Sequence, residues 1–207
     1  MLSASVKELN HLLGNIDIYL LDQILKARFH KSHKILDAGC GEGRNLIYFI
    51  RNGYRIWAID RDVDAIQMLK YLVKSINKEY PIDRFISGHV ENLPYNDEEF
   101  DAVISSAVLH FAENQSHFLS MIGEMVRILK PGGTLFVRMA ADMGMEDKIQ
   151  PLKDGKFLLP DKSVRYLLTR QQLYEIINDF GFGFIEPFKT VIVDEKRCMS
   201  TLVLKKL

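Results

Sequence analysis

Residues 34–45, with the sequence KILDAGCGEGRN, constrain the fold of this chain more than any other segment. A short apolar run ends at an acid, Asp37, and glycines follow at every second position, Gly39, Gly41 and Gly43. Because glycine lacks a Cβ and adopts positive φ readily, bare backbone can approach a ligand closely in such a turn. The amphipathic pattern that follows predicts a helix, whose first N–H groups can bind polar ligand atoms. The segment therefore predicts a buried strand, a ligand-binding turn and the start of a helix.

The spacing of the glycines distinguishes between two classes of cofactor. A dinucleotide-binding fingerprint reads G-x-G-x-x-G. Here the third glycine, Gly43, comes one residue early, and Arg44 stands where the fingerprint has glycine. A carboxylate such as Asp37 repels a pyrophosphate and attracts an ammonium group. The segment therefore favours a zwitterionic nucleoside that carries an amino acid, and it argues against the main alternative, a nicotinamide-dependent oxidoreductase.

The pattern Asp37-x-Gly39-x-Gly41-x-Gly43 resembles motif I of the class I methyltransferases that use S-adenosylmethionine. The resemblance extends over residues 35–139 and includes an acid after the second predicted strand and a Leu-Lys-Pro-Gly-Gly turn. It implies S-adenosylmethionine as the cofactor and S-adenosylhomocysteine as the product. We expect the small-molecule type of this family.

The resemblance implies an α/β fold with a Rossmann-like, mostly parallel sheet of seven strands in the order 3-2-1-4-5-7-6. The last strand should be antiparallel, because the last two strands follow each other without a helix, and helices should cover both faces. Pro187 fits an edge strand, where its missing N–H costs little. Hydrophobic periodicity predicts strands over 34–38, 55–59, 84–87, 100–105, 134–139, 184–193 and 199–205. It predicts helices over 6–29 with a break at Gly14-Asn15, over 44–51, 62–76, 114–130 and 169–179.

We expect one domain, residues 1–207, with two additions to the sheet and its helices. Residues 1–31 should form an N-terminal helical cap. Residues 140–168 interrupt the alternation of strands and helices and should form an insertion over the active face. Within this insertion, residues 156–159 and 163–168 could pair as a small hairpin.

Composition restricts the partners of this chain. Its 207 residues contain 27 lysines and arginines and 27 aspartates and glutamates, so nucleic acid, which usually binds a net basic protein, is a disfavoured partner. The two cysteines, Cys40 and Cys198, lie far apart and indicate neither a disulfide framework nor a zinc site, and we expect no metal. The sequence has no signal-peptide pattern and no apolar run of roughly 20 residues that could span a bilayer. We expect a cytoplasmic monomer or homodimer with no membrane partner.

Ligands of open parallel sheets bind beyond the carboxyl ends of the strands, so the site residues should follow the strands directly. The resemblance implies that Asp37 acts on the ammonium group of the cofactor, directly or through water, and that Arg44 reaches its carboxylate. The turn that surrounds this amino-acid part consists of Gly39, Cys40, Gly41 and Gly43. Cys40 is expected to fill space there and to have no catalytic role.

Later strand ends supply the other expected cofactor contacts. By resemblance, Asp60 accepts hydrogen bonds from both ribose hydroxyls, for which an acceptor-only carboxylate is suited. Arg61 covers the ribose or the adenine edge. His89 stands where the family often has an acid, and its neutral imidazole can still accept one bond from the adenine amino group, with Val90 packing on the ring. Ser105 should lie beside the sulfonium.

Fewer signals point to the methyl acceptor. His110 is the best candidate for a general base, although a packed or surface histidine is the alternative. Tyr19 could close the methionine end of the site, or it is a core aromatic residue. Arg165 and Tyr166 in the insertion could line the acceptor pocket.

The resemblance thus implies a methyltransferase that transfers the methyl group to a small-molecule acceptor by in-line displacement. An RNA or protein methyltransferase and a non-catalytic cofactor-binding module are the alternatives. The segment after the fourth strand is not of the Asn/Asp-Pro-Pro-Tyr type that methylates exocyclic base nitrogens, which argues against adenine or cytosine in nucleic acid as acceptor. The identity of the acceptor does not follow from the sequence.

Overall fold

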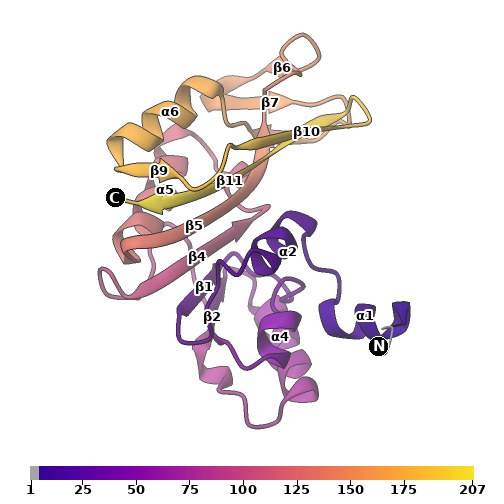
Figure 1. Ribbon diagram of the computed structural model, residues 1–207. Coiled ribbons are helices and arrows are strands. Elements are labelled where there is room, and N and C mark those ends of the chain that lie inside the picture. The colour runs from indigo at the N-terminus through magenta and orange to yellow at the C-terminus, as the bar shows by residue number, and fades with distance from the viewer. Residues whose placement is uncertain (1–4) are drawn as a thin grey trace.

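The structure of the chain is a computed structural model in which residues 5–207 are described, so residues 1–4 of the expected cap lie outside the described part. A central sheet of eight strands organises the molecule (Figure 1). Its strands are β1 (Lys34–Ala38), β2 (Arg55–Asp60), β3 (Phe85–Ser87), β4 (Phe100–Ser106), β5 (Leu129–Ala141), β9 (Phe182–Phe184), β10 (Lys189–Val193) and β11 (Arg197–Lys206).

The strands of this sheet lie in the order β10-β11-β5-β4-β1-β2-β3, with β9 also paired to β11. β1 is parallel to both β2 and β4, and β4 is parallel to β5. β11 runs antiparallel to β5, from the pair Cys198 and Ala141 to the pair Lys205 and Thr134. The predicted order 3-2-1-4-5-7-6 with an antiparallel last strand is therefore confirmed, with β11 as the seventh strand.

The predicted sixth strand, residues 184–193, is wrong in one respect, because it is two strands rather than one. β9 and β10 both pair with β11, and Pro187 lies in the break between them. Proline has no N–H to donate to a ladder, and in the break between two short strands no ladder bond is required of it. β5 also begins at Leu129 rather than Thr134, with an irregularity in its pairing to β4.

Helices cover both faces of the sheet, as predicted. They are α1 (Val6–Leu13), α2 (Ile18–Leu25), α3 (Ile47–Arg51), α4 (Val63–Ile76), α5 (Gln115–Ile128) and α6 (Arg170–Asp179), with short 3₁₀ segments η1 (Ile82–Arg84), η2 (Leu109–Phe111) and η3 (Lys153–Gly155). Successive strand residues point to opposite faces, so Ile35 packs with α2, α3 and α4, whereas Leu36 packs with α5 and α6. The helix predicted over 44–51 begins only at Ile47, because two tight turns precede it. In these turns the Gly43 N–H donates to the Cys40 carbonyl and the Leu46 N–H donates to the Gly43 carbonyl.

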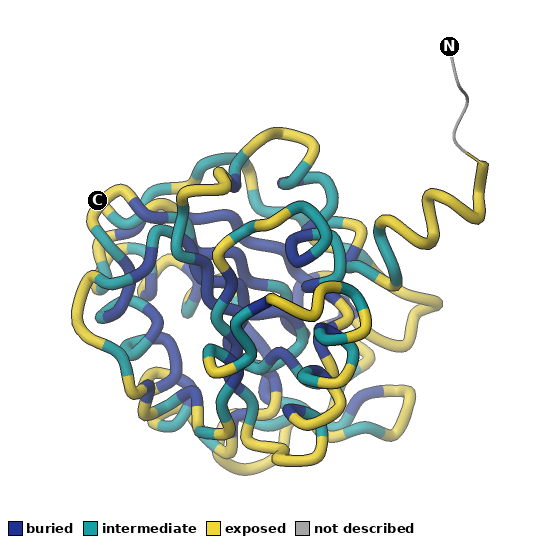
Figure 2. The backbone as a smooth tube through the Cα atoms, turned by 90° about the horizontal axis from the view of Figure 1, so that it is seen from below, coloured by how far each residue is buried: buried dark blue, intermediate teal, exposed yellow. Residues whose placement is uncertain are grey.

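The N-terminal segment forms two helices, as the Gly14-Asn15 break predicts. Gly14 has φ 64° and ψ −147°, which ends α1, and Asp17 caps α2 by accepting the N–H of Tyr19. No residue of α1 is buried, and Figure 2 shows this helix projecting from the body of the molecule. Within residues 5–207, none of the helices combines the length and the apolar character needed to cross a membrane.

The segment 140–168 contains a second, three-stranded sheet. Its strands are β6 (Gln150–Pro151), β7 (Lys156–Leu158) and β8 (Val164–Tyr166), all paired antiparallel. The predicted hairpin is thus present, with β7 and β8 as its strands. β8 lies against η2, and the Arg165 guanidinium lies 4.9 Å from the centre of the Phe111 ring. The segment therefore reaches the loop that follows β4.

Candidate functional site

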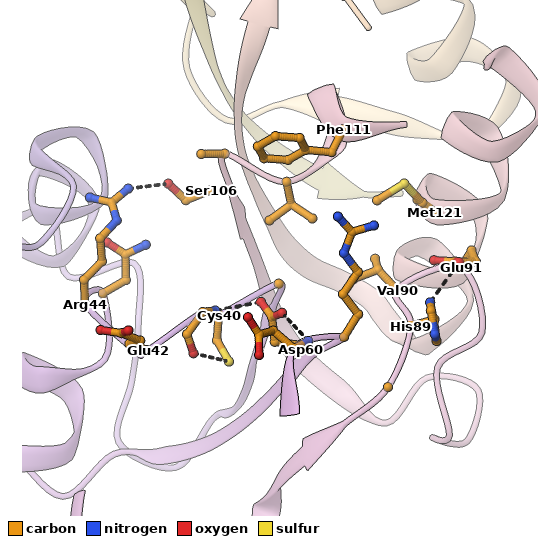
Figure 3. Close-up of a pocket in the computed structure, with 18 of the residues that line it drawn as sticks. Cys40, Glu42, Arg44, Asp60, His89, Val90, Glu91, Ser106, Phe111 and Met121 are labelled. Atoms are coloured by element: carbon orange, nitrogen blue, oxygen red, sulfur yellow. Dashed lines mark hydrogen bonds and ion pairs between the residues drawn. The ribbon is translucent and has the colours of Figure 1, made fainter. Parts of the chain in front are cut away.

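A cleft of about 680 Å³ opens at the carboxyl ends of β1, β2 and β4. β1 is flanked by β2 on one side and β4 on the other, so the cleft lies where the strand order reverses, the usual ligand site of an open α/β sheet. Figure 3 shows Arg44 and Ser106 at one end, His89 and Glu91 at the other, and Asp60 between them. The lining residues are Asn15, Gly39, Cys40, Gly41, Glu42, Arg44, Asn45, Asp60, Arg61, Asp62, Gly88, His89, Val90, Glu91, Ser106, Ala107, Val108, Phe111, His117 and Met121.

The glycines of the turn have different roles. All have positive φ, 85° at Gly39, 52° at Gly41 and 81° at Gly43. A Cβ on Gly39 would lie 2.3 Å from a methyl of Val108, and one on Gly43 would lie 2.3 Å from a methyl of Leu69. A Cβ on Gly41 would meet nothing within 4 Å. Packing therefore requires the outer two glycines, whereas Gly41 leaves open space on the cleft side of the turn.

Asp60, at the end of β2, organises the centre of the cleft. Its Oδ2 accepts the Gly41 N–H at 2.8 Å and its Oδ1 accepts the Asp62 N–H at 3.0 Å. Asp62 in turn caps α4 by accepting the N–H groups of Asp64 and Ala65, so the capping role is filled without Asp60. A carboxylate has about four lone-pair sites, so each oxygen of Asp60 can still accept a further bond from a ligand.

Asp37 lies beneath the turn rather than in the cleft wall. Its side chain is buried, and its Oδ2 has no hydrogen-bond partner in the described part of the chain. Burial raises the pKa of Asp37 to about 7; Arg44 acts in the opposite direction, and Asp60 adds to the increase. The carboxyl group therefore titrates near neutral pH, and a cation bound nearby would favour its ionised form.

The far end of the cleft contains an acid that the sequence analysis missed. Glu91 lies with its carboxylate 3.3 Å from Nδ1 of His89 and 3.4 Å from Nε2 of His117. Burial favours a higher pKa for Glu91, but a backbone hydrogen bond and the two histidines outweigh it and lower the pKa. In the sequence, His89 stands where the family often has an acid. Glu91, an acid two residues later in the same loop, could have been found from its position directly after Val90.

The end of β4 differs from the prediction by one residue. Ser105 is fully buried and its hydroxyl has no hydrogen-bond partner in the described part, whereas Ser106 lines the cleft. The prediction that Ser105 faces the ligand therefore does not match the geometry. Side chains alternate along a strand, so an error of one residue in the strand end exchanges the two faces.

His110 is buried on η2 and is not a lining residue. Its Nδ1 accepts the backbone N–H of Ala140 at 3.2 Å. Burial lowers the pKa of His110 to about 4, and the charges of Arg165 and Arg197 contribute to the decrease. His110, the expected general base, is thus neutral, and its Nδ1 already accepts a hydrogen bond. The next residue, Phe111, lines the cleft.

The expected cofactor residues divide into two groups. Those that line the cleft are Gly39, Cys40, Gly41, Arg44, Asp60, Arg61, His89 and Val90. Those that do not are Tyr19, Asp37, Gly43 and Ser105. The Arg138 guanidinium lies 5.0 Å from the centre of the Tyr19 ring. Among the residues of the N-terminal cap, Asn15 lines the cleft. Residues 5–207 contain no group of three or more His, Cys, Asp or Glu side chains that could hold a metal ion.

Comparisons with known proteins agree with this arrangement. Residues 36–137 match the family model described as "Methyltransferase domain". The malonyl-[acyl-carrier protein] O-methyltransferase of Pectobacterium atrosepticum is 30% identical over 121 residues, 58% of this chain and 44% of that protein. The chain therefore spans less than half the length of this relative.

Solved structures share the fold. A methyltransferase described as SAM-dependent from Methanosarcina mazei aligns with a TM-score of 0.74 and 21% identity, over 89% of this chain and 97% of that one. The 1,6-didemethyltoxoflavin-N1-methyltransferase of Burkholderia thailandensis, with 1,6-didemethyltoxoflavin and S-adenosylhomocysteine bound, aligns with a TM-score of 0.69 and 17% identity, over 97% and 81%. The sheet order and the cleft at its switch point define the class I methyltransferase fold. The chain belongs to the class I S-adenosylmethionine-dependent methyltransferase family.

Proposed function

We propose that this protein transfers the methyl group of S-adenosylmethionine to a small-molecule acceptor. The observation that carries the proposal is the open backbone at Gly41, beside the Asp60 carboxylate in the cleft and above the buried Asp37. Bare main chain with two acids suits a nucleoside that carries hydroxyls and an ammonium group, and it repels a diphosphate.

The residues of the cleft then have distinct roles. Asp60 receives the ribose hydroxyls on the lone pairs that its two backbone bonds leave free. Val90 packs against the adenine, and the Asp37 charge attracts the ammonium group from beneath the turn. When bound, the cofactor supplies a methyl group on a sulfonium. The protein contributes position, because alignment of the acceptor at about 3–3.5 Å from that carbon accounts for much of the catalysis.

The apolar part of the cleft supports a small acceptor. Val108, Phe111 and Met121 line it, and the whole cleft, which also receives the cofactor in this proposal, has a volume of about 680 Å³. The relative from Pectobacterium is named a malonyl-[acyl-carrier protein] O-methyltransferase, and the neighbour from Burkholderia holds 1,6-didemethyltoxoflavin. The balanced charge of the chain favours this proposal over an RNA methyltransferase. We propose that the segment 140–168 contributes to the acceptor wall through Arg165, which stacks on Phe111.

Titration calorimetry with S-adenosylhomocysteine and with NAD tests the proposed cofactor. We expect S-adenosylhomocysteine to bind and NAD to give no heat. A panel of carboxylate, phenol, thiol and amine acceptors, assayed for release of S-adenosylhomocysteine, then tests the transfer. Tight binding with no release across the panel would favour the non-catalytic module instead, and NAD binding would contradict the proposal.

Replacement of Gly41 by alanine should weaken S-adenosylhomocysteine binding roughly tenfold, or about 1.4 kcal/mol, because its Cβ enters the open side of the turn. Gly53→Ala is the matched control. Gly53 also has positive φ, 71°, and open space around its Cβ position, but it lies after α3 and away from the cleft. Both variants should lose roughly 1–2 kcal/mol of stability in urea denaturation. Equal affinity of the two variants for the ligand would contradict the assignment of this turn.

A further inference from the structure

A buried carboxylate joins three separate parts of the fold beside the cleft. Asp17 lies at the start of α2, and only 3% of its side chain is exposed. Its Oδ1 accepts the Tyr19 N–H at 2.9 Å, which caps the helix. Its Oδ2 lies 3.1 Å from Nη1 of Arg138 on β5 and 3.9 Å from Nη2 of Arg44 in the glycine turn. The capping oxygen and the ion-pairing oxygen are therefore different atoms.

The same turn holds the N-terminal segment by further contacts. The Asp17 N–H donates to Oδ1 of Asn45 at 3.0 Å, and this bond is buried. Arg44 donates to the carbonyl of Asn15 at 3.4 Å and to Oγ of Ser106 at 3.5 Å. Figure 3 shows the Arg44 and Ser106 side chains facing each other at one end of the cleft. Arg44 is thus held at the cleft wall by long contacts.

Arg44 and Arg138 have the same ion-pair partner, Asp17. Arg44 also lies near enough to the buried Asp37 to lower its pKa, but it forms no ion pair with that carboxyl group. The shorter contact goes to Arg138, which is the more buried of the two, with 19% of its side chain exposed against 43% for Arg44. The positive charge of Arg44 therefore remains available to an anion in the cleft.

We infer that Arg138 is a positioning residue: it binds the buried carboxylate of Asp17, and so leaves Arg44, with Ser106, free to bind the carboxylate of the cofactor's amino-acid tail. This inference rests on the proposed function. Without Arg138, Asp17 would have Arg44 as its remaining cationic partner, because a buried carboxylate left unpaired is costly. Arg44 would then be neutralised and turned from the cleft.

The experiment compares two nucleosides that differ only in the tail. S-adenosylhomocysteine carries the amino acid, whereas 5′-methylthioadenosine has the same nucleoside and thioether without it. We expect Arg138→Gln and Arg44→Gln each to weaken S-adenosylhomocysteine roughly tenfold by calorimetry, and to change methylthioadenosine by less than about twofold. Arg55→Gln, the same change at the opposite end of the sheet, should alter neither affinity.

A second substitution separates positioning from a structural role. When Arg138→Gln is combined with Asp17→Asn, the new amide side chain still caps α2 but no longer competes for Arg44. The affinity for S-adenosylhomocysteine should therefore return to near that of the wild type. Arg138→Lys keeps a cation for Asp17, so it should retain the wild-type affinity for S-adenosylhomocysteine. This variant serves as the test if Arg138→Gln does not fold. Equal weakening of both nucleosides, or no recovery in the double variant, would overturn the inference.

The outcomes also distinguish failure of this inference from failure of the proposed function. If Arg44→Gln leaves S-adenosylhomocysteine unchanged, the corner does not bind the tail and the inference fails, while the proposed function stands. If the wild type binds neither nucleoside, the proposed function fails, and the inference fails with it.

Discussion

Asp60→Ala is expected to weaken S-adenosylhomocysteine binding roughly 10- to 150-fold, the equivalent of about 1.5–3 kcal/mol for hydrogen bonds to a charged group. The carboxylate lines the cleft, and the variant removes the acceptor of the ribose hydroxyls. It also removes the partner of the Gly41 and Asp62 N–H groups, although the turn keeps the backbone hydrogen bonds from the Gly39 and Cys40 N–H groups to the Ile59 carbonyl on β2. Titration calorimetry at one pH and salt concentration measures the effect.

Two further variants separate these contributions. Asp60→Asn keeps the shape and one strong acceptor, so its affinity should fall between those of the wild type and the alanine variant. Asp64→Ala removes an exposed acid from the first turn of α4, outside the cleft, and should leave the affinity unchanged. A loss of stability in Asp60→Ala without loss of ligand affinity would mean that Asp60 only supports the turn.

The sequence predicted those features of the fold that depend on local pattern. Apolar runs and glycine turns along the chain predict the strands from β1 to β5, but their order in the sheet came from the resemblance to the family. The lack of a helix between the last two strands predicts the antiparallel β11. The break at Pro187 was not predicted, because a proline fits both an uninterrupted edge strand and a gap between two short ones. Only the pairing of β9 and β10 with β11 distinguishes these possibilities.

The site was predictable to the extent that backbone spacing determines it. The glycine turn, Asp60 and Val90 follow strand ends, and the structure brings them to one cleft. The choice of Ser105 over Ser106 depended on a strand end, which periodicity locates only to within a few residues. The contact between Asp17 and Arg138 joins residues 121 positions apart, and no local pattern predicts such a pair.

Asp37→Asn is expected to gain stability relative to the wild type as the pH rises from 5 to 8 in the absence of ligand, because the variant lacks the titration of a buried carboxyl group. His110, whose pKa burial lowers to about 4, changes stability in the opposite direction in both proteins, so the wild type and the variant are compared at each pH. Burial raises the pKa of Asp37 from 3.8 to about 7 in the folded protein. The unfolded chain therefore releases this proton at lower pH than the folded chain, so Asp37 destabilises the fold as pH rises toward 7. Between pH 5 and pH 8 the wild type should lose about 3 kcal/mol of unfolding free energy through this group. Urea denaturation at the two pH values, for wild type and variant, measures the difference.

Asp101→Asn supplies a control of opposite sign. Burial favours a higher pKa for Asp101, but hydrogen bonds from Lys130 and from the Lys34 N–H outweigh it and lower the pKa. The stability that Asp101 contributes is present above its unfolded pKa and is lost only in acid, so this variant should keep the pH 5 to pH 8 difference of the wild type. A difference in unfolding free energy between the wild type and Asp37→Asn that is the same at both pH values would mean that Asp37 is solvated in solution.

The same titration also tests the link between Asp37 and the ligand. An ammonium group held near Asp37 favours the carboxylate, so saturating S-adenosylhomocysteine should lower the pKa of Asp37 and bind more tightly at pH 8 than at pH 5. Because linkage is reciprocal, the pH dependence of affinity should disappear in Asp37→Asn, which cannot ionise. If the affinity of the wild type for the ligand is the same at both pH values while its stability titrates as expected, Asp37 is buried as described but does not act on the ammonium group.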